Sequence, residues 1–304
     1  MTYRDDLVEE VLLNLSGFLT DQELIGTLAG NIVSNAATFT VTGSVFADGA
    51  TGFQPGIAEI GNELVYVGNV APATGVFSLV SRGFRGTTAA AWVAGTQVRA
   101  NPRVPRISVV RAINDTLQSL YPRLYGVNST EFTASGSVMT YDLPATTVDV
   151  LKCSWQVPGP SGFWPTIRRW RFDPNASTSS ATGKQVTIWE GMSGRKVQVV
   201  VRQTPGQFSL AAATNEDYTT ATNLPEWTKE VVTLGAAFKI MSFMDAGTVS
   251  ERTAEGALMG SQGGSGVSAQ KLAAHLYAMY QERLTNAESQ LRATHDVGTV
   301  HYTG

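Results

Sequence analysis

The sequence predicts an α+β fold in which a discontinuous helical bundle domain carries two inserted antiparallel β modules. Apolar residues recur at helical spacing at the start, in the middle and near the end of the chain, and glycine-punctuated β-type runs lie between these segments. Each predicted helix has one apolar stripe that it cannot bury alone, so the helices are expected to pack on one another. The helical domain is expected to comprise residues 1–25, 105–125 and 225–295, and the β modules to span 30–103 and 128–222.

The N-terminal segment is expected to form a helix. Acidic residues occupy its first turns, where they interact favourably with the helix dipole, and Thr2 is a suitable N-cap. Thr20 and Glu23 form a Thr-x-x-Glu capping box, which predicts a second short helix from Asp21. The apolar stripe of the first helix consists of Val8, Val11, Leu12, Leu15, Phe18 and Leu19.

The segment between residues 36 and 100 predicts a small antiparallel β module. It contains short β-type runs separated by glycines, such as GIAEIGNELVYVG and GVFSLVSRGFRGTT. A helix is expected to follow over residues 106–121, because Pro105 and Pro122 punctuate its ends. The stripe of this helix consists of Val109, Ile113, Leu117 and Leu120.

The second β module is expected to be another antiparallel sheet or a sandwich, interrupted by the polar loop NASTSSATG. Its strands are expected at residues 138–143, 148–156, 162–172, 185–189 and 196–203.

The last third of the chain predicts two helices. The first starts at Pro225 and has the stripe Trp227, Val231, Leu234, Phe238 and Met241. The second covers residues 268–292 and has the stripe Leu272, Leu276, Tyr280, Leu284, Ala287 and Leu291. The connection over residues 247–267 is longer than the usual two to eight residues or so, and it is expected to be a mobile or docking loop. The polar tail 296–304 is expected to fray or to dock on a neighbour.

Composition excludes several protein classes. The chain has 304 residues, of which 43% are hydrophobic, 15% are charged, 30 are glycines and one is a cysteine. Such a chain is too apolar to be disordered, and it has no disulfide framework. No apolar run is long enough for a membrane span, and the acidic N-terminus is unlike a secretory signal, so an intracellular, soluble product without a membrane segment is expected.

The charges are unevenly distributed along the chain. Residues 1–30 carry one base and six acids, residues 101–214 twelve bases and six acids, and residues 215–304 six bases and ten acids. Acidic ends therefore flank a basic middle. In a ring of copies, this pattern would produce stacked bands of opposite charge that could order the docking of neighbouring assemblies.

No motif for catalysis, metal binding or cofactor binding emerges from the sequence. The three histidines lie within the last thirty residues without an accompanying nucleophile motif, and Cys153 lies in an apolar strand-like run, which is typical of a small core residue. Glu59 and Glu63 straddle a turn and are expected to be solvated. We therefore expect no catalytic, metal or cofactor residues and no enzyme activity.

The richest cluster of arginines and aromatics is FWPTIRRWRF, residues 163–172. In a strand, Arg169 and Arg171 would lie on one face and Trp170 and Phe172 on the other. Three interpretations stay open: a contact between subunits, which we favour, a plain strand, and a surface that stacks on nucleobases.

Residues 50–125 resemble a segment found in virion proteins of tailed bacteriophages. The resemblance rests on GFQPGIAEIGNELVYVGNV, with its Ile-Gly-x-Glu strand pair, followed by VSRGFRGTT and GTQV. Trp92 departs from the pattern, because histidine is expected at this position in many relatives. The terminal YQERLTNAESQLR helix resembles the long last helix of head-to-tail adaptor, or connector, proteins.

This resemblance implies a non-enzymatic part of the virion neck that is assembled in the host cytoplasm. It implies a homo-oligomeric ring, commonly twelve-fold, which is formed by the helical domain and joins the portal to the next tail or stopper component. DNA would only pass through its channel. The alternatives are a tail-tip, baseplate or fibre-attachment structural protein and a virion-associated hydrolase. The residues expected at interfaces are Arg168, Arg169, Trp170, Arg171, Phe243, Met244, Tyr277, Tyr280, His301 and Tyr302.

Overall fold

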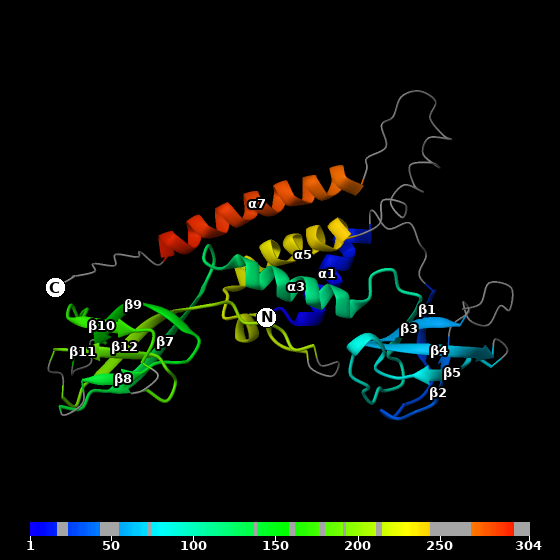
Figure 1. Cartoon of the computed structure of the whole chain (residues 1–304), viewed down its shortest axis with the longest axis horizontal. Coiled ribbons are helices and arrows are strands. Elements are labelled where there is room, and N and C mark those ends of the chain that lie inside the picture. The colour runs from blue at the N-terminus through cyan, green and yellow to red at the C-terminus, as the bar shows by residue number, and fades with distance from the viewer. Residues whose placement is uncertain are drawn as a thin grey trace, which may run out of the picture.

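Three hydrophobic cores organise the chain in the computed structural model (Figure 1). One core belongs to the helices, and two belong to β units that lie at opposite ends of the helical part. The predicted mixed α+β class is therefore correct. The structure describes residues 1–16, 24–42, 55–71, 74–136, 139–157, 162–176, 180–190, 193–210, 215–243 and 269–294. The predicted loop 247–267 and the predicted tail 296–304 lie outside these ranges.

Four helices from distant parts of the chain share the first core. They are α1 (Arg4–Ser16), α3 (Arg106–Leu120), α5 (Lys229–Phe243) and α7 (Ala269–Thr294). The predicted stripe of α3 is completely buried, and from Leu276 onwards so is that of α7. Gly235 lets α5 lie close to both α3 and α7, because a Cβ at this position would lie 2.5 Å from the Thr116 methyl group of α3 and 2.9 Å from the Tyr280 ring of α7. The short helices α4 (Tyr218–Thr222) and η2 (Glu226–Thr228) precede α5.

Two N-terminal predictions are wrong. Thr2 does not cap α1, since its hydroxyl donates to Glu226, and the Tyr3 N–H instead donates to the Asp6 carboxylate over 2.8 Å. The predicted helix from Asp21 begins outside the described residues and cannot extend beyond Glu23, because Leu24–Leu28 forms strand β1. Strand pairing on both edges of β1 overrides the local capping signal.

The first β unit is a closed six-stranded barrel with the strand order β1-β2-β5-β4-β3-β6. All neighbouring strands are antiparallel, and Phe39 and Phe77 stack in its core with ring centroids 5.0 Å apart. Gly75 has φ +65°, and a Cβ there would lie 2.4 Å from the Val41 carbonyl oxygen. The remaining elements are β2 (Thr38–Thr42), β3 (Gly56–Ile60), β4 (Glu63–Ala71), β5 (Val76–Ser81), the single turn η1 (Phe84–Gly86) and β6 (Gln97–Ala100).

The second β unit consists of two three-stranded sheets around one core. One sheet has the order β7-β12-β9, and the other has the order β10-β11-β8. Inward residues of both sheets, such as Val186 and Val199, are fully buried. The strands are β7 (Gly126–Thr133), β8 (Thr140–Asp142), β9 (Thr147–Trp155), β10 (Trp170–Asp173), β11 (Gln185–Ile188) and β12 (Lys196–Gln203).

Two strand predictions in this unit need correction. Strand β7 was not expected, although it pairs with β12 along its whole length. The strand expected at 162–172 is wrong for most of its length, because only Trp170–Asp173 forms a strand. The segment before Trp170 pairs with β9 only at one isolated bridge, between Ser154 and Thr166. A longer ladder does not form there, because Pro165 has no backbone N–H to donate.

Candidate functional site

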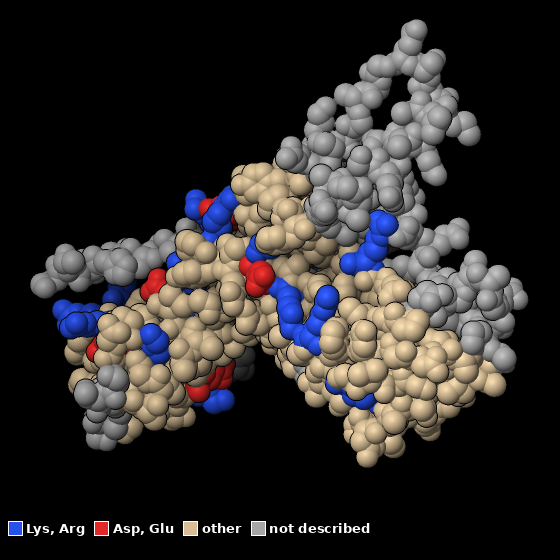
Figure 2. Space-filling view, turned by 45° about the vertical axis from the view of Figure 1, so that its right-hand side comes forward, with Lys and Arg blue, Asp and Glu red and all other residues tan. Residues whose placement is uncertain are grey.

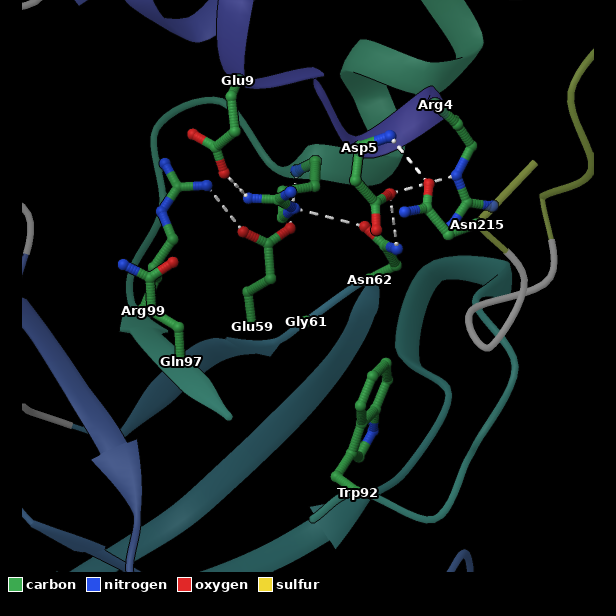
Figure 3. A pocket seen from close by; sticks show the side chains of 11 residues that line it. Arg4, Asp5, Glu9, Glu59, Gly61, Asn62, Trp92, Gln97, Arg99 and Asn215 are labelled. Carbon is green, nitrogen blue, oxygen red and sulfur yellow. Dashed lines mark hydrogen bonds and ion pairs between the residues drawn. The ribbon is translucent and has the colours of Figure 1, made fainter. Parts of the chain in front are cut away.

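A hollow among the described residues lies where the barrel meets the helices. It is a cavity of about 320 Å³ lined mostly by charged and amide side chains, which Figure 3 shows from close by. The lining residues come from α1, from strand β3 and the turn after it, from β6 and the segment before it, from the start of α3 and from the segment before α4. They are Arg4, Asp5, Glu9, Glu59, Gly61, Asn62, Trp92, Gln97, Arg99, Arg106 and Asn215.

These polar groups bond to one another. The Glu59 carboxylate accepts from Arg99 Nη1 over 2.8 Å and from the backbone N–H of Arg106 over 2.6 Å, and the guanidinium of Arg106 pairs with Glu9. Asn62 Nδ2 donates to a carboxylate oxygen of α1 over 3.3 Å. The expectation that Glu59 is solvated is wrong, since it is 1% exposed. The cluster therefore holds the barrel against α1 and α3.

Glu63 is the centre of a second buried network, inside the barrel. Its carboxylate accepts from Arg82 Nε and Nη2 (2.6 and 2.8 Å), from the backbone N–H groups of Gly83 and Ala90 (both 3.1 Å) and from Trp92 Nε1 (2.8 Å). Burial alone would raise the pKa of Glu63, but these hydrogen bonds and the positive charge of Arg82 outweigh it and hold the pKa below its ordinary value of 4.5. Glu63 is fully buried, so its expected solvation is also wrong.

This network explains the sequence motif structurally. The glutamate of Ile-Gly-x-Glu and the arginine of Val-x-Arg-Gly lie far apart in sequence and form one ion pair that fixes the turn after β5. Trp92, which departs from the motif, supplies an indole N–H to the same carboxylate. Its ring also lies against Gly61, where a Cβ would come within 2.7 Å of it. Trp92 therefore has a bonding role within the barrel.

The described residues contain no group of three or more His, Cys, Asp and Glu side chains that could hold a metal ion. Cys153 is fully buried in the second β unit, as expected for a core residue, and burial raises the pKa of its thiol to about 12. His275 is exposed on α7, and the other two histidines lie outside the described residues. No helix in the described part of the chain is both long and apolar enough to cross a membrane.

The residues expected at interfaces fall into two separate groups. On β10 and the segment before it, Arg168, Arg169 and Arg171 are exposed, whereas Trp170 packs partly on the core. On α5 and α7, Phe243 is 88% exposed and Tyr277 46% exposed. Tyr280 is buried in the helical core, so it is not a surface residue of this chain. Met244, His301 and Tyr302 lie outside the described residues.

Sequence reasoning missed two surface features. Trp189 is 50% exposed and lies opposite Arg169. The backbone N–H of Trp189 donates to the carbonyl oxygen of Arg169 over 3.1 Å. The barrel exterior is almost without charge, because Arg85 is the one exposed charged side chain among the barrel residues that the structure describes. Figure 2 shows the barrel lobe, at the right, as nearly free of acidic and basic groups. Residues 31–100 contain three bases and three acids, and this even count did not reveal that Glu59, Glu63 and Arg99 are buried.

Exposed valines, and few charged side chains, lie on the outside of the barrel. Val33, Val80 and Val93 are 61%, 68% and 67% exposed. Val80 projects over Gly68 of the neighbouring strand, where a Cβ would lie 2.5 Å from the valine methyl group. The outer surface of the barrel is therefore apolar in places, which is typical of surfaces that contact other protein.

No family model matches the chain. No curated protein matches it. Among solved structures, a chain described as "Neck of empty GTA particle computed with C6 symmetry" is similar at 14% identity, with a TM-score of 0.22, over 56% of this chain and 77% of that chain. A likeness of this size does not establish a shared fold.

Proposed function

We propose that this chain is a structural, non-enzymatic subunit of a tailed-phage-like particle. In this proposal, copies of the chain form a closed ring in the neck, which joins the portal to the next tail or stopper component around the DNA channel. The proposal draws on the sequence resemblance over residues 50–125 and on the character of the surface.

The observation that carries the proposal is the charge-poor exterior of the barrel. A soluble domain ordinarily covers about 25–35% of its surface with charged residues, and the centre of a protein–protein interface is depleted in them. The described barrel exposes only the charge of Arg85 and presents Val33, Val80 and Val93 to solvent. Such a surface is suited to contact with other protein over much of its area.

Two further observations support an assembly role. Phe243 and Tyr277 expose aromatic surface where α5 meets α7, and Tyr277 also contacts Phe238 with ring centroids 5.0 Å apart. The charged cluster around Glu59 bonds the barrel to α1 and α3. A subunit with fixed internal geometry can repeat the same contact around a ring.

The test measures the mass and shape of the purified full-length chain. Light scattering coupled to size exclusion should give a large multiple of 32.4 kDa, and negative-stain images should show closed rings. Val80→Lys should lower the assembled fraction, because it adds a charge to the barrel exterior. Ser129→Lys adds the same charge to an exposed polar position of β7 and should leave the mass unchanged.

A monomeric or trimeric wild-type chain would overturn the proposed function. Normal assembly of Val80→Lys would show instead that the barrel exterior does not form the contact.

A further inference from the structure

The outer face of the β10-β11-β8 sheet brings arginines and a tryptophan together. Arg171 lies opposite Thr187, and Arg169, two residues earlier and hence on the same face, lies opposite Trp189. Trp170 alternates with these arginines and packs inward on the core. We call Arg169, Arg171 and Trp189 the Arg–Trp face, and Arg168 is exposed just before it.

Within the part of the chain that the structure describes, the guanidinium groups of Arg169 and Arg171 have no hydrogen-bond or ion-pair partner, and neither has that of the neighbouring Arg168. The nearest carboxylate in sequence, Glu190, accepts instead from the backbone N–H groups of Arg168 and Arg169 at 2.9 and 3.0 Å. The whole unit, residues 126–203, carries eight Lys and Arg against five Asp and Glu. We therefore expect this face to bind a partner that carries acidic side chains.

An acidic stripe of complementary character runs along the outside of α1. It consists of Asp6, Glu10 and Leu13, which follow one another at steps of four and three residues and so share one side of the helix. Leu13 is 72% exposed, and Glu10 has no partner among the described residues. Helix α1 contains four acids and one base.

The remaining acids of α1 are already engaged. Asp5 pairs with Arg4, and Glu9 pairs with Arg106. Among the described residues Asp6 accepts only the N–H of Tyr3, through one carboxylate oxygen, so Asp6 and Glu10 are the acids through which we expect α1 to bind a partner.

The charge spacings of the two surfaces agree. Two residues along a strand are about 6.6 Å apart, and four residues along a helix are about 6 Å apart. A helix laid along β10 can therefore place Asp6 and Glu10 beside Arg169 and Arg171 at the same time. Figure 1 places this sheet at the end of the molecule that is distant from α1, so the two surfaces of one chain do not meet.

We propose that the Arg–Trp face of one copy binds the α1 stripe of the next copy. The inference rests on the proposed function and names one of the contacts that would close the ring. Because the contact joins two different surfaces, it is heterologous, and such contacts generate rings or filaments.

Protein is favoured over nucleic acid as the occupant of this face. In the next row of the same face, Asp173 and Asp142 flank Gln185, and these carboxylates would repel a phosphate backbone. A helix with separate acidic and apolar positions avoids this repulsion and offers Leu13 to Trp189.

The experiment uses charge exchange on the full chain, with assembly measured by mass photometry over a range of concentrations. Arg169→Glu/Arg171→Glu should raise the apparent dissociation constant at least about a hundredfold, as expected for repulsion between close interfacial charges. Glu10→Arg should weaken assembly in the same direction, and it spares the Asp6 bond at the start of α1. An equimolar mixture of the two variants should assemble better than either variant alone, because in alternating copies one contact is the wild-type pair and in the other position 10 again faces opposite charge.

A matched control and a DNA-binding measurement complete the test. Lys152→Glu/Lys196→Glu changes the charge of the same β unit equally at exposed positions of β9 and β12, and it should assemble like the wild type. Circular dichroism melting should show that every variant is folded. Binding of a fluorescent 30-base-pair duplex should be unchanged by the arginine variants.

Each outcome separates the two proposals. A monomeric wild type overturns the proposed ring function itself. A wild type that assembles, with arginine and Glu10 variants that assemble equally well, overturns only this contact. Loss of DNA binding at unchanged mass overturns it in favour of nucleic acid, and failure of the mixture to assemble better than either variant alone shows that the two surfaces are not partners.

Discussion

Replacing Glu63 with glutamine removes the charge at the centre of the barrel network and keeps the side-chain size. One carboxylate oxygen accepts from Arg82 Nε and the Gly83 N–H, and the other accepts from Arg82 Nη2, the Ala90 N–H and Trp92 Nε1. Whichever way the amide is oriented, its NH₂ group faces two or three of these donors. Each buried donor left unsatisfied costs about 1–3 kcal/mol, and breaking a buried ion pair costs about 3–5 kcal/mol. We therefore expect the free energy of opening of the barrel to fall by about 3–5 kcal/mol.

Hydrogen exchange followed by mass spectrometry resolves this loss in the intact protein. Peptides covering β3, β4 and the 82–92 segment should exchange at least about a hundredfold faster in Glu63→Gln, since every 1.4 kcal/mol or so is a factor of ten. Peptides from α7 report on a separate core and should be unchanged. Arg85→Gln is the matched control, because Arg85 is exposed in the same turn. If barrel peptides of Glu63→Gln exchange within about threefold of the Arg85→Gln control, the network does not hold the barrel together.

Three further predictions concern other parts of the chain. Lowering the pH should destabilise the barrel of the wild type once the pH falls below about 4.5. The pKa of Glu63 is depressed in the folded protein, so its ionised carboxylate stabilises the barrel above that pH, and this stabilisation is lost as the carboxylate is protonated. In an acid titration followed by hydrogen exchange of barrel peptides, Glu63→Gln should lack this loss. Gly235→Ala should destabilise the helical core by about 1–3 kcal/mol in urea denaturation, since the added methyl group overlaps Thr116 and Tyr280, and an unchanged midpoint would contradict the close approach. Iodoacetamide at pH 8 should modify Cys153 about a thousandfold more slowly in the native protein than in urea, because burial raises the thiol pKa from 9.0 to about 12; equal rates would mean that the second β unit opens readily.

The helices were the most predictable part of the fold. Residues 106–121 were expected to be helical, and α3 spans Arg106–Leu120, because Pro105 and Pro122 act on the backbone locally and the 3.6-residue period requires no partner to be recognised. Strand β12 was also predicted with its observed bounds, from a valine-rich segment. Strand β7, with the sequence GVNSTEFT, is not rich in valine, and its pairing with β12 decides its conformation.

The candidate interface was only partly accessible from the sequence. Alternation correctly placed Arg169 and Arg171 outward and Trp170 inward, since neighbouring residues of a strand point to opposite faces. Trp189 could not be assigned to the same face, because its position depends on the register between β10 and β11. Tyr280 was expected at an interface between copies but packs within the helical core, since α5 covers that side of α7.

The sequence by itself determined the mixed class, the main helices and the segregated charges. These features depend on local periodicity, composition or residue type. Only the tertiary structure decided that the glutamates expected to be solvated are buried in bonded networks, that the barrel closes through β1, and that its exterior is left almost without charge. The physical reason is that burial and partner choice are set by strands and helices far apart in the chain, so the same carboxylate can be a solvated turn residue or the centre of a buried network.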